Sequence, residues 1–409
     1  MKKLFATLLV VVMIVGCFGI FTACSNDTKE FKVGVLHINP VSSTSGYTYA
    51  HQQGIEAMKK TLGLKDSQVI IKDSIDDTNS QQINAAIEEL LAQGCNMIIG
   101  TSFGYMNGMK EAALKNPKVV FSHGTGYLDT FGEGEPGNMN NYFGRIYQAR
   151  YLSGIVAGLK ASQGGKLGYV SAHGLNIAEC SSGVNAFALG VQAVNPTATV
   201  TVKTLNSWFD PTNETAHAKA LLNEGCEVIA QHCDTENPPA AAKDAGKFSI
   251  GYNSDMRKAI NDDSCLTSVV WHWGVYYTAA VREAMKCFDA EGKFISLDAW
   301  KDFGNYYGSF ADDLFGLAEL SSKVDKDTAA ILKLVEDKMK NKNDAWDVFS
   351  DKALSFENID GTWILKEVDR VLKTSDGKTV GKVEVANITG DMKYWVAGVN
   401  GPALPAENK

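Results

Sequence analysis

Two stretches of the chain align without a gap: ELLAQGCNMIIG at residues 89–100 and ALLNEGCEVIAQ at residues 220–231. They share two leucines, a glycine, a cysteine and an isoleucine at the same spacing. In each, a helix-like segment ends at the glycine and a short apolar strand follows. One matched pair is weak support for a repeat, but each copy occupies the same place in its half of the chain. The sequence therefore predicts two similar α/β lobes rather than one large sheet.

Outward from these stretches, short apolar strands alternate with helices, which is typical of parallel βαβ units. The strands of the first half read FKVGVLHI, QVIIKDSI, CNMIIGTS and KVVFSHGTG, and those of the second half KLGYVSAHG, ATVTVKTLN, CEVIAQHCD and KFSIGYNSD. Three crossovers between the lobes are expected, at residues 134–161, 269–274 and 312–324. Beyond about residue 340 the pattern loosens, and Asp-Gly pairs at 360–361 and 376–377 predict hairpin turns.

This pattern divides the chain into four parts, each with predicted boundaries. Residues 1–24 form a signal segment, and residues 346–409 form a C-terminal extension with short hairpins. The first lobe combines residues 25–143 with 272–318, and the second lobe combines residues 144–271 with 319–345.

Composition and motifs exclude several classes of function. The 409 residues are too many for one compact core. A net charge of −8 disfavours a nucleic-acid partner. The sequence has no H-E-x-x-H, G-x-S-x-G or Walker motif, and no G-x-G-x-x-G after the first strand. We therefore expect neither an enzyme nor a bound metal or cofactor. Six cysteines beyond the signal segment form no C-x-x-C pair, and their pairing stays open.

The N-terminus carries the pattern of a secretory signal. Lys2 and Lys3 precede an apolar run that extends to Phe21, and FTAC then ends at Cys24 before polar residues begin. A cysteine after small residues resembles the lipobox of bacterial lipoproteins, which predicts lipidation at Cys24. Cys17, in IVGC, is an alternative, and so is a plain signal peptide or an uncleaved anchor helix. We expect a protein held on the extracytoplasmic face of the cell membrane.

In open parallel sheets, ligands bind beyond the carboxyl ends of the strands. The residues that follow the predicted strands are aromatic, acidic or amide-bearing, which suits a planar, polar, uncharged ligand. The candidate binding residues are Tyr47, Phe103, Trp208, Asp234, Asp255 and Trp271. Each has a plainer alternative, since the two aspartates could cap helices and a tryptophan could pack at a hinge. In VVWHWGVYY, residues 269–277, strand alternation places Trp271 and Trp273 on one face, and we favour Trp271.

The chain resembles the basic membrane protein (PnrA-like) family, lipoproteins that are the purine-binding components of ABC importers. The stretches that carry the resemblance are GYTYAHQQG, TSFGYM, HGTGY, YFGRIYQARYLSGIVAG, NAFALGVQAVNP, NSWFDP, IAQHCD, IGYNSDM and MKYWVAGVNG. The first loop lacks the Asp-x-Ser-Phe-Asn motif of the nucleoside branch. The resemblance implies a type I periplasmic-binding fold, with two Rossmann-like lobes joined by three crossovers.

The resemblance also implies roles for the candidate residues. Tyr47, where relatives usually have Trp, would stack on a base, and Phe103 and Trp208 would line the pocket. Asp234 and Asp255 would accept hydrogen bonds from ring or exocyclic nitrogens. The chain departs from relatives at Trp271-His272 and lacks an Arg often found in AECSSG.

These departures leave a base, a nucleoside or a sugar derivative open as the ligand. We expect a monomer that closes on its solute and passes it to a membrane permease. The alternatives are a binding protein for a sugar or signalling molecule and a surface sensor that does not transport.

Overall fold

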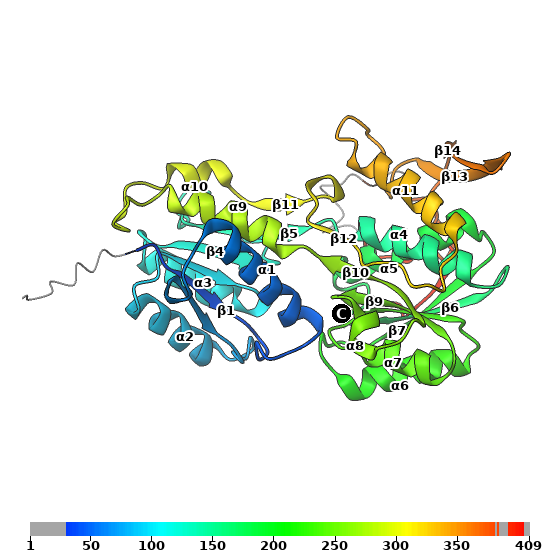
Figure 1. The fold of residues 1–409 in the computed structure, drawn as a ribbon, viewed down its shortest axis with the longest axis horizontal. Helices are drawn as coiled ribbons and strands as arrows, with labels where there is room; N and C mark the ends of the chain where they lie inside the picture. The colour runs from blue at the N-terminus through cyan, green and yellow to red at the C-terminus, as the bar shows by residue number, and fades with distance from the viewer. Residues whose placement is uncertain (1–29, 381–382, 384–391, 405–409) are drawn as a thin grey trace, which may run out of the picture.

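The computed structural model describes residues 30–380, 383 and 392–404. The predicted signal segment, with Cys17 and Cys24, lies outside these residues, as does most of the strand, residues 378–388, that would follow the hairpin turn predicted at Asp376-Gly377. Two lobes lie side by side and the chain passes between them at their centre (Figure 1). Within the described residues, none of the helices has the length and apolar character needed to span a bilayer.

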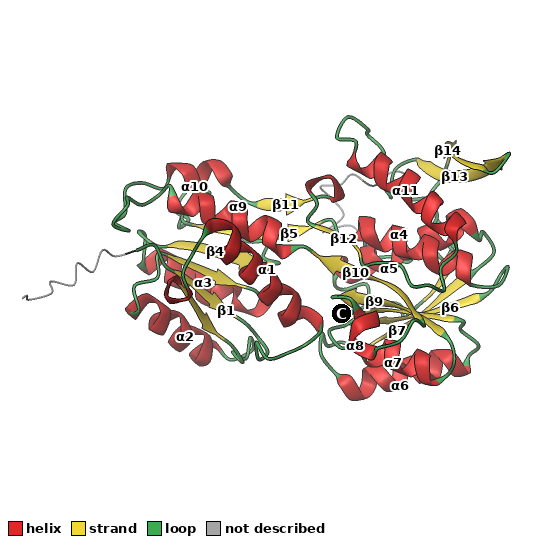
Figure 2. Cartoon of the chain, viewed as in Figure 1, coloured by secondary structure: helices red, strands yellow, loops and turns green. Residues whose placement is uncertain are grey.

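The first lobe contains a six-stranded parallel sheet in the order β11-β5-β4-β3-β1-β2. Its strands are β1 (Val33–Leu36), β2 (Val69–Lys72), β3 (Met97–Gly100), β4 (Val120–Gly124), β5 (Met139–Gly144) and β11 (Tyr306–Gly308). Its helices are α1 (Gly46–Leu62), α2 (Ser80–Ala92), α3 (Met106–Lys115), α9 (Trp273–Met285) and α10 (Asp298–Phe303). Helix α1 packs on α9 and α2 packs on α3, so helices cover both faces of the sheet (Figure 2).

The second lobe repeats this arrangement in the order β12-β10-β9-β8-β6-β7-β15. Its strands are β6 (Lys166–Ser171), β7 (Thr199–Thr204), β8 (Val228–His232), β9 (Phe248–Asn253), β10 (Cys265–Trp271), β12 (Phe315–Leu317) and β15 (Val399–Asn400). Its helices are α4 (Tyr147–Lys160), α5 (Ala178–Val194), α6 (Pro211–Asn223), α7 (Asn237–Asp244), α8 (Met256–Ile260) and α11 (Lys326–Lys340). All pairings are parallel except β12 with β10.

The two matched stretches of sequence occupy equivalent places. The first runs from α2 into β3, and the second from α6 into β8. Gly94 and Gly225 follow the two helices with φ of 79° and 91°, a left-handed conformation that favours glycine. Strands β3 and β8 hold the same position in their sheets, each next to the first strand of its lobe. The predicted pair of similar α/β lobes with parallel sheets is confirmed.

The chain crosses between the lobes three times. It leaves β5 for α4 at residues 145–146, leaves β10 for α9 at residue 272, and leaves β11 for β12 at residues 309–314. The third crossing lies earlier than the boundary expected after residue 318. Residues 315–317 belong to the second sheet because they pair with Val269, Val270 and Trp271 of β10.

Glycines allow helices α4 and α5 of the second lobe to pack closely. A Cβ on Gly154 would lie 2.1 Å from the carbonyl oxygen of Phe187, and one on Gly190 would lie 2.0 Å from that of Tyr151. Any side chain there would force the helices apart.

The C-terminal extension packs against the second lobe. Strands β13 (Lys352–Ile359) and β14 (Thr362–Asp369) form an antiparallel hairpin. Asp360 and Gly361 at its turn have φ of 51° and 85°, as a type I′ turn requires, and the hairpin predicted there is confirmed. Asp376-Gly377 also forms a turn, in which the amide of Thr374 donates to the carbonyl oxygen of Lys378. All six cysteines beyond the signal segment are free thiols and buried.

Candidate ligand-binding site

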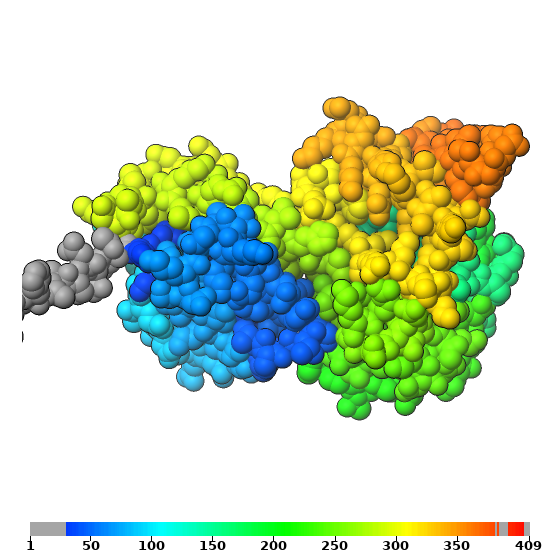
Figure 3. Space-filling model, viewed as in Figure 1, coloured from blue at the N-terminus to red at the C-terminus, as the bar shows by residue number. Residues whose placement is uncertain are grey.

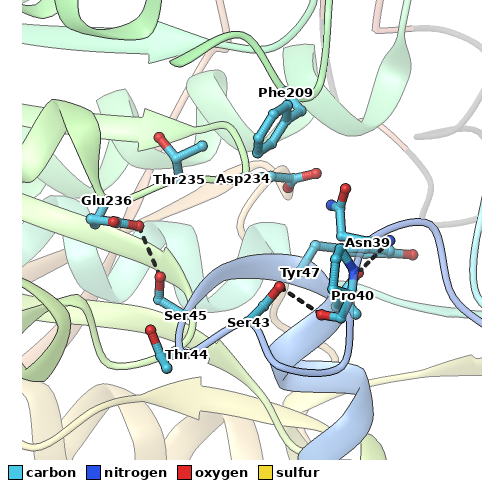
Figure 4. Close-up of a pocket in the computed structure, with 11 residues that line it drawn as sticks. Asn39, Pro40, Ser43, Thr44, Ser45, Tyr47, Phe209, Asp234, Thr235 and Glu236 are labelled. Carbon is cyan, nitrogen blue, oxygen red and sulfur yellow. Dashed lines mark hydrogen bonds between the residues drawn. The ribbon is translucent and has the colours of Figure 1, made fainter. Parts of the chain in front are cut away.

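A cavity of about 270 Å³ lies between the lobes at the carboxyl ends of their strands. The first lobe lines it with residues from the β1–α1 loop and the start of α1, and the second lobe with residues that follow β7 and β8. The lining residues are Asn39, Pro40, Ser43, Thr44, Ser45, Tyr47, Thr48, Phe209, Asp234, Thr235 and Glu236. In the view of Figure 4, Asp234 lies between Phe209 of the second lobe and Tyr47 of the first.

Tyr47 is held by the first turn of α1. Its hydroxyl donates a hydrogen bond to the carbonyl oxygen of Thr101, which follows β3. Its ring meets the ring of His51 edge-on, with centroids 4.3 Å apart. Burial raises the pKa of the Tyr47 hydroxyl well above its ordinary value. Because the hydroxyl is already bonded, the ring is the part of Tyr47 that a ligand would meet.

The lobes touch each other beside Tyr47. The hydroxyl of Ser45 donates to Glu236 at 2.8 Å, and the amide of Gly46 donates to the hydroxyl of Ser254 at 3.0 Å. A Cβ on Gly46 would lie 2.2 Å from the carbonyl oxygen of Asp234, and its φ is 82°. Figure 3 shows the first lobe, in blue, meeting the second lobe, in green. The lobes are therefore closed at this end of the cavity.

Asp234 is a buried carboxyl two residues beyond the end of β8. It is 8% exposed, and it accepts a hydrogen bond from the side-chain amide of Asn253 at 2.9 Å. Burial raises the pKa of Asp234 well above its ordinary value, and the nearby carboxylate of Glu214 raises it further. Asn253 opposes this rise. A solute that donates a hydrogen bond to Asp234 would stabilise its charged form.

Of the candidate residues, the structure brings Tyr47 and Asp234 together in one cavity. Phe103 is 46% exposed and lies beside Tyr127, with ring centroids 6.0 Å apart. Trp208 is half-buried against His173, with centroids 5.0 Å apart. Neither ring lines the cavity.

Asp255 and Trp271 also lie away from the cavity lining. Asp255 stands at the start of α8 and forms an ion pair with Lys258 at 3.3 Å, but its side chain makes no capping hydrogen bond. Trp271 is 6% exposed and stacks on Trp273 at 4.2 Å, while His272 contacts the carbonyl oxygen of Asp313 at 3.0 Å. The strand ends at Trp271 and α9 begins at Trp273, so strand alternation does not extend across this hinge.

Sequence reasoning missed Phe209, which is 53% exposed and lines the cavity from the second lobe. The stretch NSWFDP contains both aromatics, and the sequence gives no sign of which one faces the cleft. Among the described residues, no group of three or more His, Cys, Asp or Glu side chains is placed to hold a metal ion.

The sequence profile of one protein family matches residues 31–302. The family is described as ABC transporter substrate-binding protein PnrA-like. The chain belongs to this family. It is therefore a solute-binding protein of an ABC transporter, and its family is one of binding proteins rather than enzymes.

Two relatives carry more detailed names. A purine-binding protein of Brucella abortus is 34% identical over 272 residues, which cover 66% of this chain and 72% of the relative. A putative ABC transporter glucose-binding protein of Haloferax volcanii is 36% identical over 233 residues, which cover 57% of this chain and 56% of the relative. The two names differ in ligand class.

Solved structures of solute-binding proteins share the fold. An ABC transporter solute-binding protein of Conexibacter woesei matches with a TM-score of 0.58 and 16% identity, covering 78% of this chain and 98% of that one. One of Aeropyrum pernix matches with a TM-score of 0.59 and 14% identity, covering 81% and 94%. The predicted fold of a periplasmic solute-binding protein is confirmed.

Proposed function

We propose that this family member binds a purine base or nucleoside between its lobes and passes it to an ABC permease. One observation carries the proposal: an aromatic ring from each lobe, Tyr47 and Phe209, lines the same cavity as the buried carboxyl of Asp234. Planar heterocycles stack on aromatic rings, and their N–H groups donate to carboxylates. The similarity to a purine-binding protein points to the same ligand class.

Closure of the lobes captures the solute. Three crossings of the chain form the hinge, and the Ser45–Glu236 and Gly46–Ser254 contacts hold the closed side. A ligand that touches both Tyr47 and Asp234 binds the closed form more tightly than the open form, so it shifts the population toward closure.

The permease acts at the membrane, and Cys24 is the residue that would hold the protein there. Lipidation at Cys24 follows from the apolar run and the small residues before it. A single acyl chain anchors only marginally, whereas the diacyl form implied by a lipobox anchors stably. We propose a lipid-anchored, monomeric, extracytoplasmic protein without a nucleic-acid partner.

A sugar is the second candidate ligand. The cavity presents many oxygen atoms, including those of Asn39, Ser43 and Glu236, which suit the hydroxyls of a sugar. The relative described as a putative glucose-binding protein is 36% identical in the region it shares with this chain.

A thermal-shift screen separates the candidates. Residues 25–409 would be heated with adenine, guanine, hypoxanthine, their nucleosides or glucose. A ligand at 100 times its Kd stabilises the folded state by about 2.7 kcal/mol, which raises the melting temperature. We expect a rise with purines that is lost in Asp234→Ala, and a rise with glucose alone would overturn the purine proposal.

Phe209 and Trp208 provide a matched pair of variants. Phe209→Ala removes a ring that lines the cavity, so we expect purine affinity to fall by about 5- to 10-fold, the usual value of an aromatic contact. Trp208→Ala removes a neighbouring ring that packs against His173 and should change affinity less. Calorimetric titration measures both, and a larger loss in Trp208→Ala would place the stacking ring at Trp208.

A further inference from the structure

A second carboxyl, Glu179, lies in the first turn of α5, outside the set of residues that line the cavity. Its side chain is 18% exposed. Nε2 of His232 donates to its Oε1 at 3.0 Å, and the hydroxyl of Tyr252 donates to the same oxygen at 3.4 Å. Both contacts use Oε1, and Oε2 takes no part in them.

The partners of Glu179 are themselves fixed. The indole N–H of Trp271 donates to the hydroxyl of Tyr252 at 3.3 Å. The guanidinium of Arg150 lies 3.8 Å from the centroid of the Tyr252 ring and donates to the carbonyl oxygen of Gln231. Arg150 therefore packs against the face of the Tyr252 ring. A carboxyl held by two fixed donors on one oxygen is pre-organised to accept on the other.

Glu179 lies at the carboxyl edge of the second lobe's sheet, because α5 follows β6 and its contact His232 ends β8, two residues before the cavity residue Asp234. Its negative charge raises the pKa of Tyr47 and of Tyr307 in the first lobe, after the larger effect of burial on each, and it also raises that of Asp234. The ionisable groups around it are Arg150 of α4, Cys180 of α5, His232 of β8, Tyr252 of β9, Asp234 after β8, His173 after β6, and Tyr47 and Tyr307 of the first lobe.

We propose that Glu179 is a second hydrogen-bond acceptor for the bound solute, selecting a neutral ligand that presents donors both to Asp234 and to Glu179. This inference rests on the proposed function. Two chemical groups of a purine solute would satisfy it: the exocyclic amino group of an aminopurine, or the ribose hydroxyls of a nucleoside. Each offers a donor to a carboxylate.

Because only the ionised carboxyl is purely an acceptor, a bound donor would favour release of the proton from Glu179. Burial raises its pKa to about 7, although Arg150 and the hydroxyl of Tyr252 oppose the rise. Burial lowers the pKa of His232 well below its ordinary value, so this imidazole stays neutral and leaves the carboxylate uncompensated. A donor from the solute would stabilise that charge.

Four ligands tested on Glu179→Gln distinguish the two sources of the donor. The variant keeps the shape of the side chain but can turn an amide N–H₂ toward the solute. Calorimetric titration of the full chain would use adenine, hypoxanthine, adenosine and inosine. If Glu179 binds the amino group, the affinity of the variant for adenine and adenosine should fall by about 10-fold or more, the usual value of a hydrogen bond to a charged group. Its affinity for hypoxanthine and inosine should change little.

If Glu179 binds the ribose, the affinities for adenosine and inosine should fall together while those for the two bases do not. Either pattern supports the inference. No change, or an equal loss for all four ligands, would overturn it. Should wild-type protein bind none of the four, the proposed purine function itself fails, which is a distinguishable result.

Two further variants serve as controls for this test. Glu224→Gln removes an exposed carboxylate that pairs with Lys203 on the surface, and it should leave all four affinities unchanged. Glu179→Asp keeps the charge but withdraws it by one methylene. It should reproduce the selective pattern more weakly, and a uniform loss would again contradict a ligand-reading role.

Discussion

At the scale of residues, two buried carboxyls lie near the carboxyl ends of the strands of the second lobe. Asp234 and Glu179 both have a raised pKa because burial penalises their charged forms. Neither makes an ion pair with a lysine or arginine among the described residues. The charged form of each carboxyl is therefore desolvated without a paired cation. A hydrogen-bond donor on the ligand would stabilise that charged form.

The raised pKa of Glu179 predicts a pH-dependent stability. The folded chain holds this proton up to about pH 7, whereas the unfolded chain releases it near 4.5, so stability falls as pH rises between these values. Because the group is buried, we expect a loss of about 2–3 kcal/mol. Glu179→Gln cannot lose a proton and should escape it.

Urea unfolding at pH 5 and pH 8 measures this effect. The free energy of unfolding of Glu179→Gln, relative to wild type, should be higher at pH 8 than at pH 5. An equal difference at both values would show that Glu179 titrates normally.

The sequence predicted some of these residues and not others, for physical reasons. Tyr47 and Asp234 were predicted because they follow strands, and the carboxyl ends of parallel strands meet at one edge. Phe209 and Glu179 depend on which way a loop turns and on contacts between distant segments. Glu179 meets His232 across 53 positions of sequence, which no local pattern reveals.

At the scale of elements, the sequence predicts helix ends and turns more reliably than contacts between distant strands. The helix-ending glycines at 94 and 225 and the Asp360-Gly361 turn act through backbone conformation alone. The pairing of β12 with β10 is a contact between distant strands, and the third crossing was accordingly placed too late. The same limit applies to the start of α9, which ends the strand pattern at Trp271.

The contact between α4 and α5 gives a prediction about stability. Gly154→Ala would place a Cβ 2.1 Å from the carbonyl oxygen of Phe187, inside any allowed contact. We expect a loss of about 2 kcal/mol, since overpacking outweighs the better helix propensity of alanine. Chemical denaturation measures it.

Gly174→Ala is the control for this variant. The nearest atom to its added Cβ is 3.5 Å away, an ordinary contact, so its unfolding midpoint should move little. Equal losses in the two variants would show that the α4–α5 contact is not the cause.

At the scale of the whole molecule, the proposed closure of the lobes depends on the hinge and on the contact beside Tyr47. Ser254→Ala removes the acceptor that the amide of Gly46 uses across the cleft. The open form would expose that amide to water, so the closed form alone loses stability, by about 1 kcal/mol. We expect ligand affinity to fall by about 5-fold.

Small-angle X-ray scattering and titration test this prediction together. Ser254→Ala without ligand should show a larger radius of gyration than wild type and should contract when ligand is added. Ser322→Ala, at an exposed hydroxyl of the second lobe, should behave as wild type. An unchanged radius of gyration and an unchanged affinity in Ser254→Ala would show that the Gly46–Ser254 contact does not contribute to closure.

The most direct test of the account is a crystal structure of residues 25–409 grown with a saturating purine that binds in solution. We predict density for the base in the cavity between Tyr47 and Phe209, with a ring or exocyclic nitrogen within hydrogen-bond distance of Asp234. A purine bound elsewhere on the molecule, with this cavity empty, would contradict the central claim.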